Sequence, residues 1–423
     1  MILDRTVAPE FQIPEQVNFP SPIKKTLQNG VSLYFMATPE IGAVKLEINA
    51  DSNRVTGIVE KKLVSYFTLH LLMEGTKSKS SADLDTFFDT YASEVEVISN
   101  FEHNGLGLLT TKKHFNTVLP VFRELMTEAI FPEKELAKRK SQKALSISIQ
   151  REQNGNRASH LFRQELFGEE HPFGQISDEQ DVEAISREDL VSFYSEKLWV
   201  NPEVFLAGNL SEEEVEKVCE ILGDLPTISF ESKNPDFVNL PKPRLEERKE
   251  SALQSSLRVG CHLIPKNHPD YFGLWVFNVF LGGYFGSRLI KNIREDKGHT
   301  YGIYSSIGSL KNADYWVVMA DVIKEHTETV IDEIYHEVKR LQEEPIPIEE
   351  IEIVRNYLIG NLLSNFSSSF DLISRFKSIH QAGLDFGFYE KQLEYIKTFK
   401  PEDIQAIGKK YLLKENMVEV IVG

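Results

Sequence analysis

The sequence contains very little cysteine. Of its 423 residues only two are cysteines, Cys219 and Cys261. Two cysteines cannot build a disulfide framework, and the spacing between them is not that of a metal site. We therefore interpret both as buried small hydrophobic residues in a protein from a reducing compartment.

Positive charge is scarce relative to negative charge. The chain has 47 Lys and Arg residues against 64 Asp and Glu residues, which gives a formal net charge of −17. This balance argues against nucleic-acid binding, which needs a basic surface, and against docking on an anionic membrane. A cationic or unfolded peptide is a more compatible partner, although excess acid is usually only a solvated surface.

Long apolar segments are missing as well. No apolar run approaches the length of a membrane span, and residues 1–10 lack the apolar core of a signal peptide. With 41% apolar and 26% charged residues, the composition is that of an ordinary globular protein. We therefore expect a cytoplasmic protein that does not enter a membrane.

The patterns that are present predict an α+β fold. Asn29-Gly30 between alternating apolar residues predicts a hairpin, and the alternation over Ala43–Ala50 predicts a strand. A helix is expected from about residue 58 to residue 74, closed by Gly75, and a capped helix should begin at Ser80. The order of strands and helices predicts sheets that are mostly antiparallel, with helices packed on one face.

The pattern then repeats. Residues 185–190 match residues 399–404 at an offset of 214, and His114, Thr117 and Val118 match His326, Thr329 and Val330 at an offset of 212. Between the repeats lies a charged segment with three prolines. We therefore predict two homologous domains, 1–232 and 251–423, joined by a linker at 233–250.

The first repeat contains an incomplete metal motif. Residues 66–70 read Y-F-T-L-H, whereas an inverted zinc-peptidase motif reads H-x-x-E-H. Such a motif places two histidines on one helix face and leaves the glutamate to activate water. Tyr66 is a poor zinc ligand, Leu69 cannot accept a proton, and His70 alone cannot hold zinc. We expect no metal here and interpret His70 as a partly buried, hydrogen-bonded histidine.

The second repeat contains an arginine and a tyrosine seven residues apart. Taken alone, Arg294 can be a helix C-terminal charge that complements the macrodipole, and Tyr301 can be the first residue of a strand. Gly298 between them is predicted to follow the helix end in a left-handed conformation. The residues by themselves leave open whether the pair is structural or functional.

Several segments resemble a known family. Residues 68–76 read T-L-H-L-L-M-E-G-T, residues 166–174 read L-F-G-E-E-H-P-F-G, and Asn201-Pro202 precedes Gly208-Asn209-Leu210. These segments and the two-fold repeat are similar to the short, two-domain members of the inverted-zincin metallopeptidases, the family of insulinase, pitrilysin and mitochondrial processing peptidase. The resemblance covers nearly the whole chain.

The resemblance assigns roles to specific positions. Tyr66 stands where the first zinc ligand belongs, Leu69 where the general base belongs, and Arg139 at the favoured position of a third, glutamate ligand. Arg294 and Tyr301 match the R-x-x-x-G-x-x-Y pair that reaches peptide substrate from the C-terminal domain. The resemblance therefore implies the zinc-less subunit of a heterodimeric peptidase, with zinc on a homologous partner subunit.

A homodimer is the alternative to the heterodimer. Two other hypotheses for the function remain. The chain could be a structural or scaffolding homologue that binds a protein partner. It could also be an independent enzyme that uses His70, His103 and Glu74, although no base–nucleophile spacing supports that. The glycine-rich segment 281–287 lacks the Lys-Ser/Thr of a phosphate loop, so we reject nucleotide binding.

Overall fold

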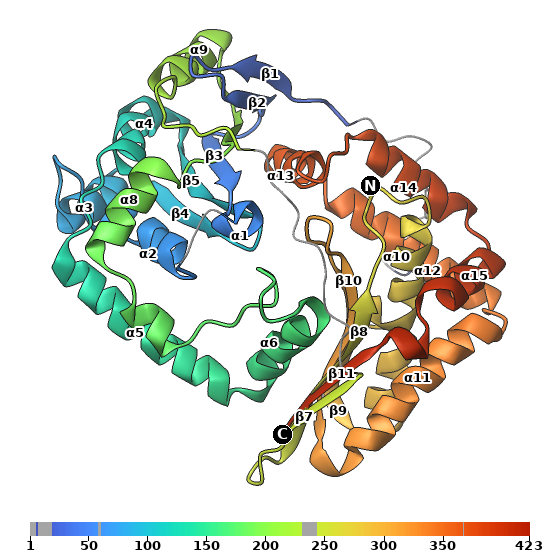
Figure 1. Cartoon of the computed structure of the whole chain (residues 1–423). Helices are drawn as coiled ribbons and strands as arrows, with labels where there is room; N and C mark the ends of the chain where they lie inside the picture. Colours follow the sequence, from blue (N-terminus) through green and yellow to red (C-terminus); the bar gives the residue numbers. More distant parts are fainter. Residues whose placement is uncertain (1–5, 7–18, 58–60, 231–242, 367) are drawn as a thin grey trace.

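The chain forms two α+β halves that face each other (Figure 1). The computed structural model describes all residues except 1–5, 7–18, 58–60, 231–242 and 367. In the first half the described strands form one sheet in the order β1-β2-β6-β3-β5-β4. In the second half they form a sheet in the order β7-β11-β8-β10-β9. In the described ranges, no helix has both the length and the apolar character needed to cross a bilayer.

The first half contains these elements. Its strands are β1 (Ile23–Thr26), β2 (Ser32–Ala37), β3 (Ala43–Asp51), β4 (Glu94–Ser99), β5 (His103–Thr111) and β6 (Glu203–Gly208). Its helices are α1 (Asn53–Thr56), α2 (Val64–His70), a 3₁₀ turn η1 (Leu72–Glu74), α3 (Ser81–Thr90), α4 (Lys112–Thr127), α5 (Glu133–Glu152), α6 (Asn154–Phe167), α7 (Glu179–Glu183), α8 (Arg187–Glu196) and α9 (Glu212–Ile221).

The second half contains a matching set. Its strands are β7 (Arg244–Glu247), β8 (Gln254–His262), β9 (Thr300–Gly308), β10 (Tyr315–Ile323) and β11 (Val418–Val422). Its helices are α10 (Tyr271–Asn278), the π-helical η2 (Val279–Gly283) and η3 (Ile290–Asp296), the 3₁₀ turns η4 (Lys324–His326) and η5 (Lys414–Asn416), α11 (Thr327–Glu343), α12 (Ile348–Ser364), α13 (Ser369–His380), α14 (Gly387–Thr398) and α15 (Pro401–Tyr411).

The strand pairing confirms the predicted internal repeat. Strand β2 runs parallel to β6, and β6, β3, β5 and β4 then follow as antiparallel neighbours. Strand β7 likewise runs parallel to β11, followed by antiparallel β8, β10 and β9. The two halves therefore share one topology, and strand β1, which pairs with β2 in the hairpin around Gly30, is an addition to the first.

The segment between the halves differs from its prediction. Residues 231–242 of the expected linker lie outside the described residues. The expected linker extends to residue 250, but Arg244–Glu247 form strand β7 and pair with β11. This part of the segment therefore belongs to the second sheet.

The expected helix over 58–74 is shorter in the structure. Residues 58–60 lie outside the described residues, and α2 covers only Val64–His70 before the chain tightens into η1. Gly75 has φ 145° and ψ 147°, so it does not form the predicted left-handed helix end. The reason is local pairing, because Gly75 and Thr76 form β-bridges with Ser80 and Ala129.

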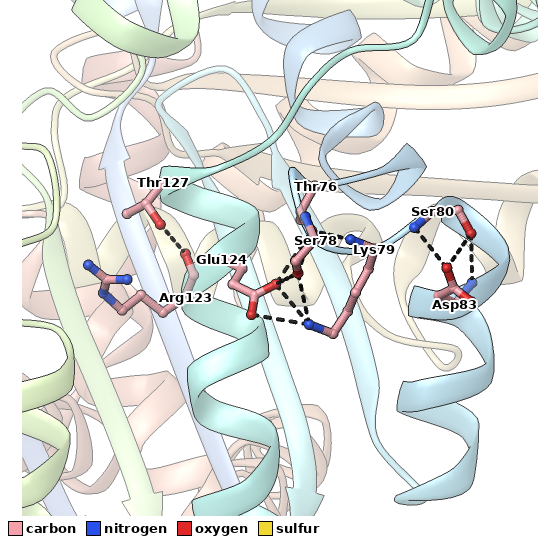
Figure 2. Close-up of polar contacts among 8 residues, drawn as sticks. All are labelled: Thr76, Ser78, Lys79, Ser80, Asp83, Arg123, Glu124 and Thr127. Carbon is pink, nitrogen blue, oxygen red and sulfur yellow. Dashed lines mark hydrogen bonds and ion pairs between the residues drawn. The ribbon is translucent and has the colours of Figure 1, made fainter.

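The turn after α2 forms hydrogen bonds with α4 and leads into α3 (Figure 2). The Glu124 carboxylate of α4 accepts hydrogen bonds from Ser78 Oγ at 2.8 Å and from Lys79 Nζ at 3.1 Å. Ser80 and Asp83 then form the reciprocal capping box that the sequence predicts. These contacts fix the end of α2 relative to α4.

One helix of each half packs on the sheet of the other half. Helix α6 of the first half lies against β8 and β11 of the second sheet. Helix α13 of the second half lies against β2 and β6 of the first sheet. We call this reciprocal packing the exchange of α6 and α13. The two exchanged helices are equivalent in the internal repeat, because α6 follows α5 and α13 follows the equivalent helix α12 (Figure 1). Each sheet has its own helices on one face, as predicted, and the exchanged helix on the other.

The α6 contact is largely apolar. Phe162 is 2% exposed and belongs to a cluster with Val317 and Val420 of the second sheet. Its ring lies over Gly260 of β8, where an added Cβ would come within 2.9 Å of the ring. The glycine therefore provides the space into which Phe162 fits.

We expect Phe162→Ala to lower the free energy of unfolding by about 3–5 kcal/mol, because it removes a buried ring and leaves a cavity between the halves. Leu145→Ala on α5 is the control, since that side chain is 62% exposed and should change the free energy by no more than about 0.5 kcal/mol. Denaturant unfolding measures both values. Equal values for the two variants would contradict the assigned role of α6.

Candidate functional site

Helix α2 places Tyr66 and His70 side by side. They are four residues apart on one face, and their ring centroids are 4.1 Å apart. His70 Nδ1 is 2.8 Å from the carbonyl oxygen of Tyr66, a hydrogen bond that orients the imidazole. Both residues line a cavity of about 380 Å³. Burial lowers the pKa of His70, with smaller contributions from nearby Arg139 and Lys143, and burial raises the pKa of Tyr66.

Leu69 does not line this cavity. Its side chain is fully buried in the core of the first half. The position at which the resemblance places a general base is therefore part of the hydrophobic core.

Helix α5 contributes cations to the surroundings of Tyr66. Lys143 lines the cavity, and its Nζ lies 4.1 Å from the centroid of the Tyr66 ring, a cation–π contact. Arg139 lies one turn earlier on α5, and its Nη2 is 2.8 Å from Glu74 Oε1. The side chain of α5 that faces the cavity is therefore Lys143, while Arg139 pairs with Glu74.

These residues do not fit a zinc ion. Zinc in proteins takes three or four ligands from thiolate, imidazole and carboxylate groups. The cavity offers one imidazole and a phenol whose ionisation is suppressed by burial, together with positive side chains that repel a cation. Within the described ranges, no group of three or more His, Cys, Asp or Glu side chains is placed to hold a metal.

The alternative set of His70, His103 and Glu74 is not assembled either. Neither His103 nor Glu74 lines the cavity at His70. His103 begins β5 opposite Asp51, and Glu74 bonds to Arg139 and Ser81. The structure gives no support to an independent site built from these three residues.

In the second half, Arg294 and Tyr301 flank the connection between η3 and β9. Arg294 lies in π-helical η3, and Gly298 follows the helix end with φ 65°, which confirms the predicted conformation of this glycine. The Arg294 guanidinium lies 5.0 Å from the ring centroid of Phe285, which is 68% exposed. Within the described residues, no carboxylate forms an ion pair with Arg294.

A β-bulge sets the direction of Tyr301. Opposite β10, the stretch from Thr300 to Ile303 carries one more residue than the stretch from Ala320 to Val322. Thr300 Oγ1 stabilises this bulge by donating to the carbonyl oxygen of Asp321 at 2.6 Å. Tyr301 is 90% exposed, so its hydroxyl is available to another molecule.

The predicted residues therefore form two separate groups. Tyr66, His70 and Lys143 share the cavity of the first half, and neither Arg294 nor Tyr301 lines it. Lys143, Arg54 and Phe101 were not singled out from the sequence. Only Lys143 had a signal, since it lies four residues after Arg139 on the same expected helix.

Comparison with known proteins shows which family the chain is similar to. Residues 184–358 match the family model described as Peptidase M16 inactive domain. The chain is a homologue of the M16 metallopeptidases. The matched residues do not include those that line the cavity, which lie between Asn53 and Lys143.

Individual relatives match most of the chain. An uncharacterised zinc protease of Bacillus subtilis, YmxG, is 23% identical over 359 residues, which cover 83% of this chain and 86% of YmxG. The probable mitochondrial-processing peptidase subunit beta of Schizosaccharomyces pombe is 20% identical over 271 residues, which cover 61% of this chain and 58% of that protein.

Solved structures share the fold. A peptidase M16 inactive domain from Pseudomonas fluorescens superposes with a TM-score of 0.86 at 21% identity, covering 95% of this chain and 98% of that one. A chain of complex III₂ from Candida albicans superposes with a TM-score of 0.72 at 16% identity, covering 95% of each chain. The two-domain M16 fold predicted from the sequence is thereby confirmed.

The cavity geometry predicts how a zinc site can be rebuilt. The double variant Tyr66→His with Lys143→Glu would place two histidines and a carboxylate around one point, so we expect it to retain about one zinc per chain after dialysis. The parent protein should retain none. Elemental analysis of both proteins measures the difference.

The matched control is Tyr66→His with Arg139→Glu, which changes the charge equally but places the carboxylate one turn away. If this control retains zinc and the Lys143 variant does not, Arg139 occupies the third-ligand position. That result would contradict our assignment of Lys143 as the α5 residue that faces the cavity.

Proposed function

We propose that this chain is the zinc-less subunit of a heterodimeric M16-type metalloendopeptidase. In this proposal it supplies Arg294 and Tyr301 to peptide bound at a zinc-bearing homologous subunit. The observation that carries the proposal is the exposure of Tyr301 on a stabilised bulge, seven residues after Arg294, in a chain whose own first-half site does not fit zinc.

The charges and contacts around the pair suit peptide binding. Arg294 has no carboxylate partner among the described residues, so its guanidinium is available to donate to the carbonyl oxygens of an extended peptide. Phe285 adds exposed aromatic surface directly beneath the guanidinium. Together these side chains can hold a peptide backbone in one orientation.

The hydrogen-bond donor groups of Arg294 and Tyr301 suggest the role of each residue in this proposal. Tyr301 Oη would donate a hydrogen bond to the scissile carbonyl oxygen as negative charge develops there, and Arg294 would hold the neighbouring carbonyls. Zinc in the partner subunit would activate the attacking water. This chain then binds and orients substrate and stabilises the oxyanion, and it does not generate the nucleophile.

The main alternative is a scaffolding role. Its support is the likeness to a chain of complex III₂, which suggests that an M16 fold also occurs within a large assembly. In that case the chain would bind a protein partner, a homologous subunit or a second copy of itself, and Arg294 and Tyr301 would be surface residues without a function in hydrolysis.

We also propose a cytoplasmic location. Cys219 and Cys261 are both free and buried, and they belong to different halves of the molecule. Burial raises the pKa of the Cys261 thiol to about 12, which disfavours the reactive thiolate. Two unreactive free thiols are compatible with a reducing compartment.

The proposal predicts activity only in a mixture. The purified chain should hydrolyse no peptide alone and should gain activity when it is combined with a zinc-bearing M16 homologue from the same organism. In that complex Tyr301→Phe should lower kcat by about 10²-fold, because one oxyanion donor is lost. Steady-state cleavage of a quenched fluorescent peptide library measures the change.

Tyr304→Phe is the matched control, since Tyr304 lies on the same strand, is 52% exposed and has no assigned role. It should leave kcat unchanged. Chelator-sensitive hydrolysis by the isolated chain would contradict the proposal. A complex whose activity is the same with Tyr301→Phe and Arg294→Ala would favour the scaffolding role instead.

A further inference from the structure

The cavity beside Tyr66 and His70 is lined by positive side chains. It holds about 380 Å³ and, within the described residues, no carboxylate lines it. Its charged lining residues are Arg54, Lys62 and Lys143, and its other polar lining residues are Asn53, Ser65, Tyr66, His70, Ser99 and Asn100. Such a lining is unusual in a chain with a net charge of −17.

Arg54 is held in place without a counterion. Its Nη1 donates to the carbonyl oxygen of Pro172 at 3.2 Å, and its guanidinium lies 5.0 Å from the centroid of the Phe101 ring. Arg163 of α6 lies 5.2 Å from the same ring. Within the described ranges, no carboxylate forms an ion pair with either arginine. Burial and the mutual repulsion of these two guanidinium groups lower the pKa of Arg54.

Lys143 is in the same situation. Its Nζ rests on the Tyr66 ring, and no carboxylate of the described chain pairs with it. Burial lowers its pKa, and the charge of Arg54 lowers it further. Nearby His160 has its pKa lowered to about 4 by burial and then by Arg163 and other cations around it, so this histidine is neutral at pH 7.

Other half-buried cations near this region are neutralised. Lys62 pairs with Asp181 at 3.1 Å and Arg139 with Glu74 at 2.8 Å. Partly buried charges without a partner cost folding free energy, which an incoming anion can recover. Arg54 and Lys143 are therefore two cations that line the cavity and that form no ion pair with a carboxylate of the described residues.

We propose that this cavity binds a carboxylate of a peptide, either an acidic side chain or a C-terminal carboxylate. Arg54 and Lys143 would bind the carboxylate, and Asn53, Ser99 and Asn100 would bond to the neighbouring peptide groups. The volume lies in the range of small-ligand sites and exceeds what a lone inorganic anion fills. The walls formed by Phe101 and Tyr66 match the apolar parts of a peptide.

This proposal is independent of the proposed function, because the cavity lies in the first half and involves neither Arg294 nor Tyr301. It concerns binding alone. A failure of peptide binding here would leave the trans activity of Tyr301 unaffected, and the reverse also holds.

Calorimetric titration of the full-length protein at low ionic strength tests the proposal. The probes are N-acetyl-Ala-Glu-Glu-Ala-amide, its Gln-Gln counterpart, Ala-Ala-Ala with a free C-terminus, the amide of that tripeptide, and inorganic phosphate. We expect at least one carboxylate peptide to bind about tenfold or more tightly than its neutral analogue, because its charge-assisted hydrogen bonds are lost in the analogue. A difference in affinity between the Glu-Glu and Gln-Gln peptides identifies an acidic side chain as the bound carboxylate. A difference between the free and amidated tripeptides identifies the C-terminus.

Variants locate the binding. Lys143→Gln and Arg54→Gln should each weaken binding of the carboxylate peptide by about tenfold or more, and the affinity should fall with added salt. Lys138→Gln is the control on the same helix, since Lys138 is exposed, and it should bind like the parent. If Arg54→Gln does not fold, Arg54→Lys with Lys143→Gln gives the same information.

Equal affinity for acidic and neutral peptides would overturn the proposal. So would unchanged affinity in the Lys143→Gln variant, or phosphate that binds more tightly than every peptide.

Discussion

The reciprocal exchange of helices α6 and α13 is the interaction on which the architecture depends. Each sheet has two faces, and the helices of its own half cover only one of them. An exposed second face would leave a large apolar surface in water. Because each half covers the other's second face with one helix, the two halves pack into a single structure (Figure 1).

The two exchanged contacts differ in chemistry. Helix α6 meets the second sheet through apolar side chains such as Phe162. Helix α13 meets the first sheet through both rings and charges, since Phe376 packs near Tyr34 while Lys377 pairs with Glu47. Burial alone would raise the pKa of Glu47, but Lys377 and Lys45 outweigh it and lower that pKa. This contact therefore contributes stability above the ordinary pKa of glutamate, and the contribution is lost as the pH falls.

Sequence patterns were sufficient for the parts of the fold that depend on local rules. The repeat, the Asn29-Gly30 hairpin, the Ser80 cap and the left-handed Gly298 each follow from residue spacing or backbone preference. The exchange of α6 and α13 could not be inferred in this way, because an amphipathic pattern shows that a helix has an apolar face and not which sheet covers it. The length of α2 was overestimated because the helical pattern does not show the β-bridges that Gly75 and Thr76 form with Ser80 and Ala129.

The candidate site shows the same limit. Tyr66 and His70 share a face because they are four residues apart, so their proximity could be predicted. On α5, Lys143 faces Tyr66 and His70, whereas Arg139 pairs with Glu74. This arrangement depends on how α5 is rotated about its axis relative to α2. The cationic cavity was not predicted at all. Its lining residues Arg54 and Lys143, and nearby Arg163, come from three different helices and meet only through tertiary packing.

One electrostatic cause accounts for two properties of the first half. A zinc ion needs ligands that donate electron pairs to a positive centre, and every cation placed around Tyr66 and His70 raises the free energy of a metal ion there. The same cations lower the free energy of a carboxylate at that point, by an amount that grows as water is excluded from the cavity. The cavity at the degenerate motif is therefore not a neutral space, because Arg54, Lys62 and Lys143 line it. Its lining favours an anion over a cation, while Tyr301 is exposed in the second half.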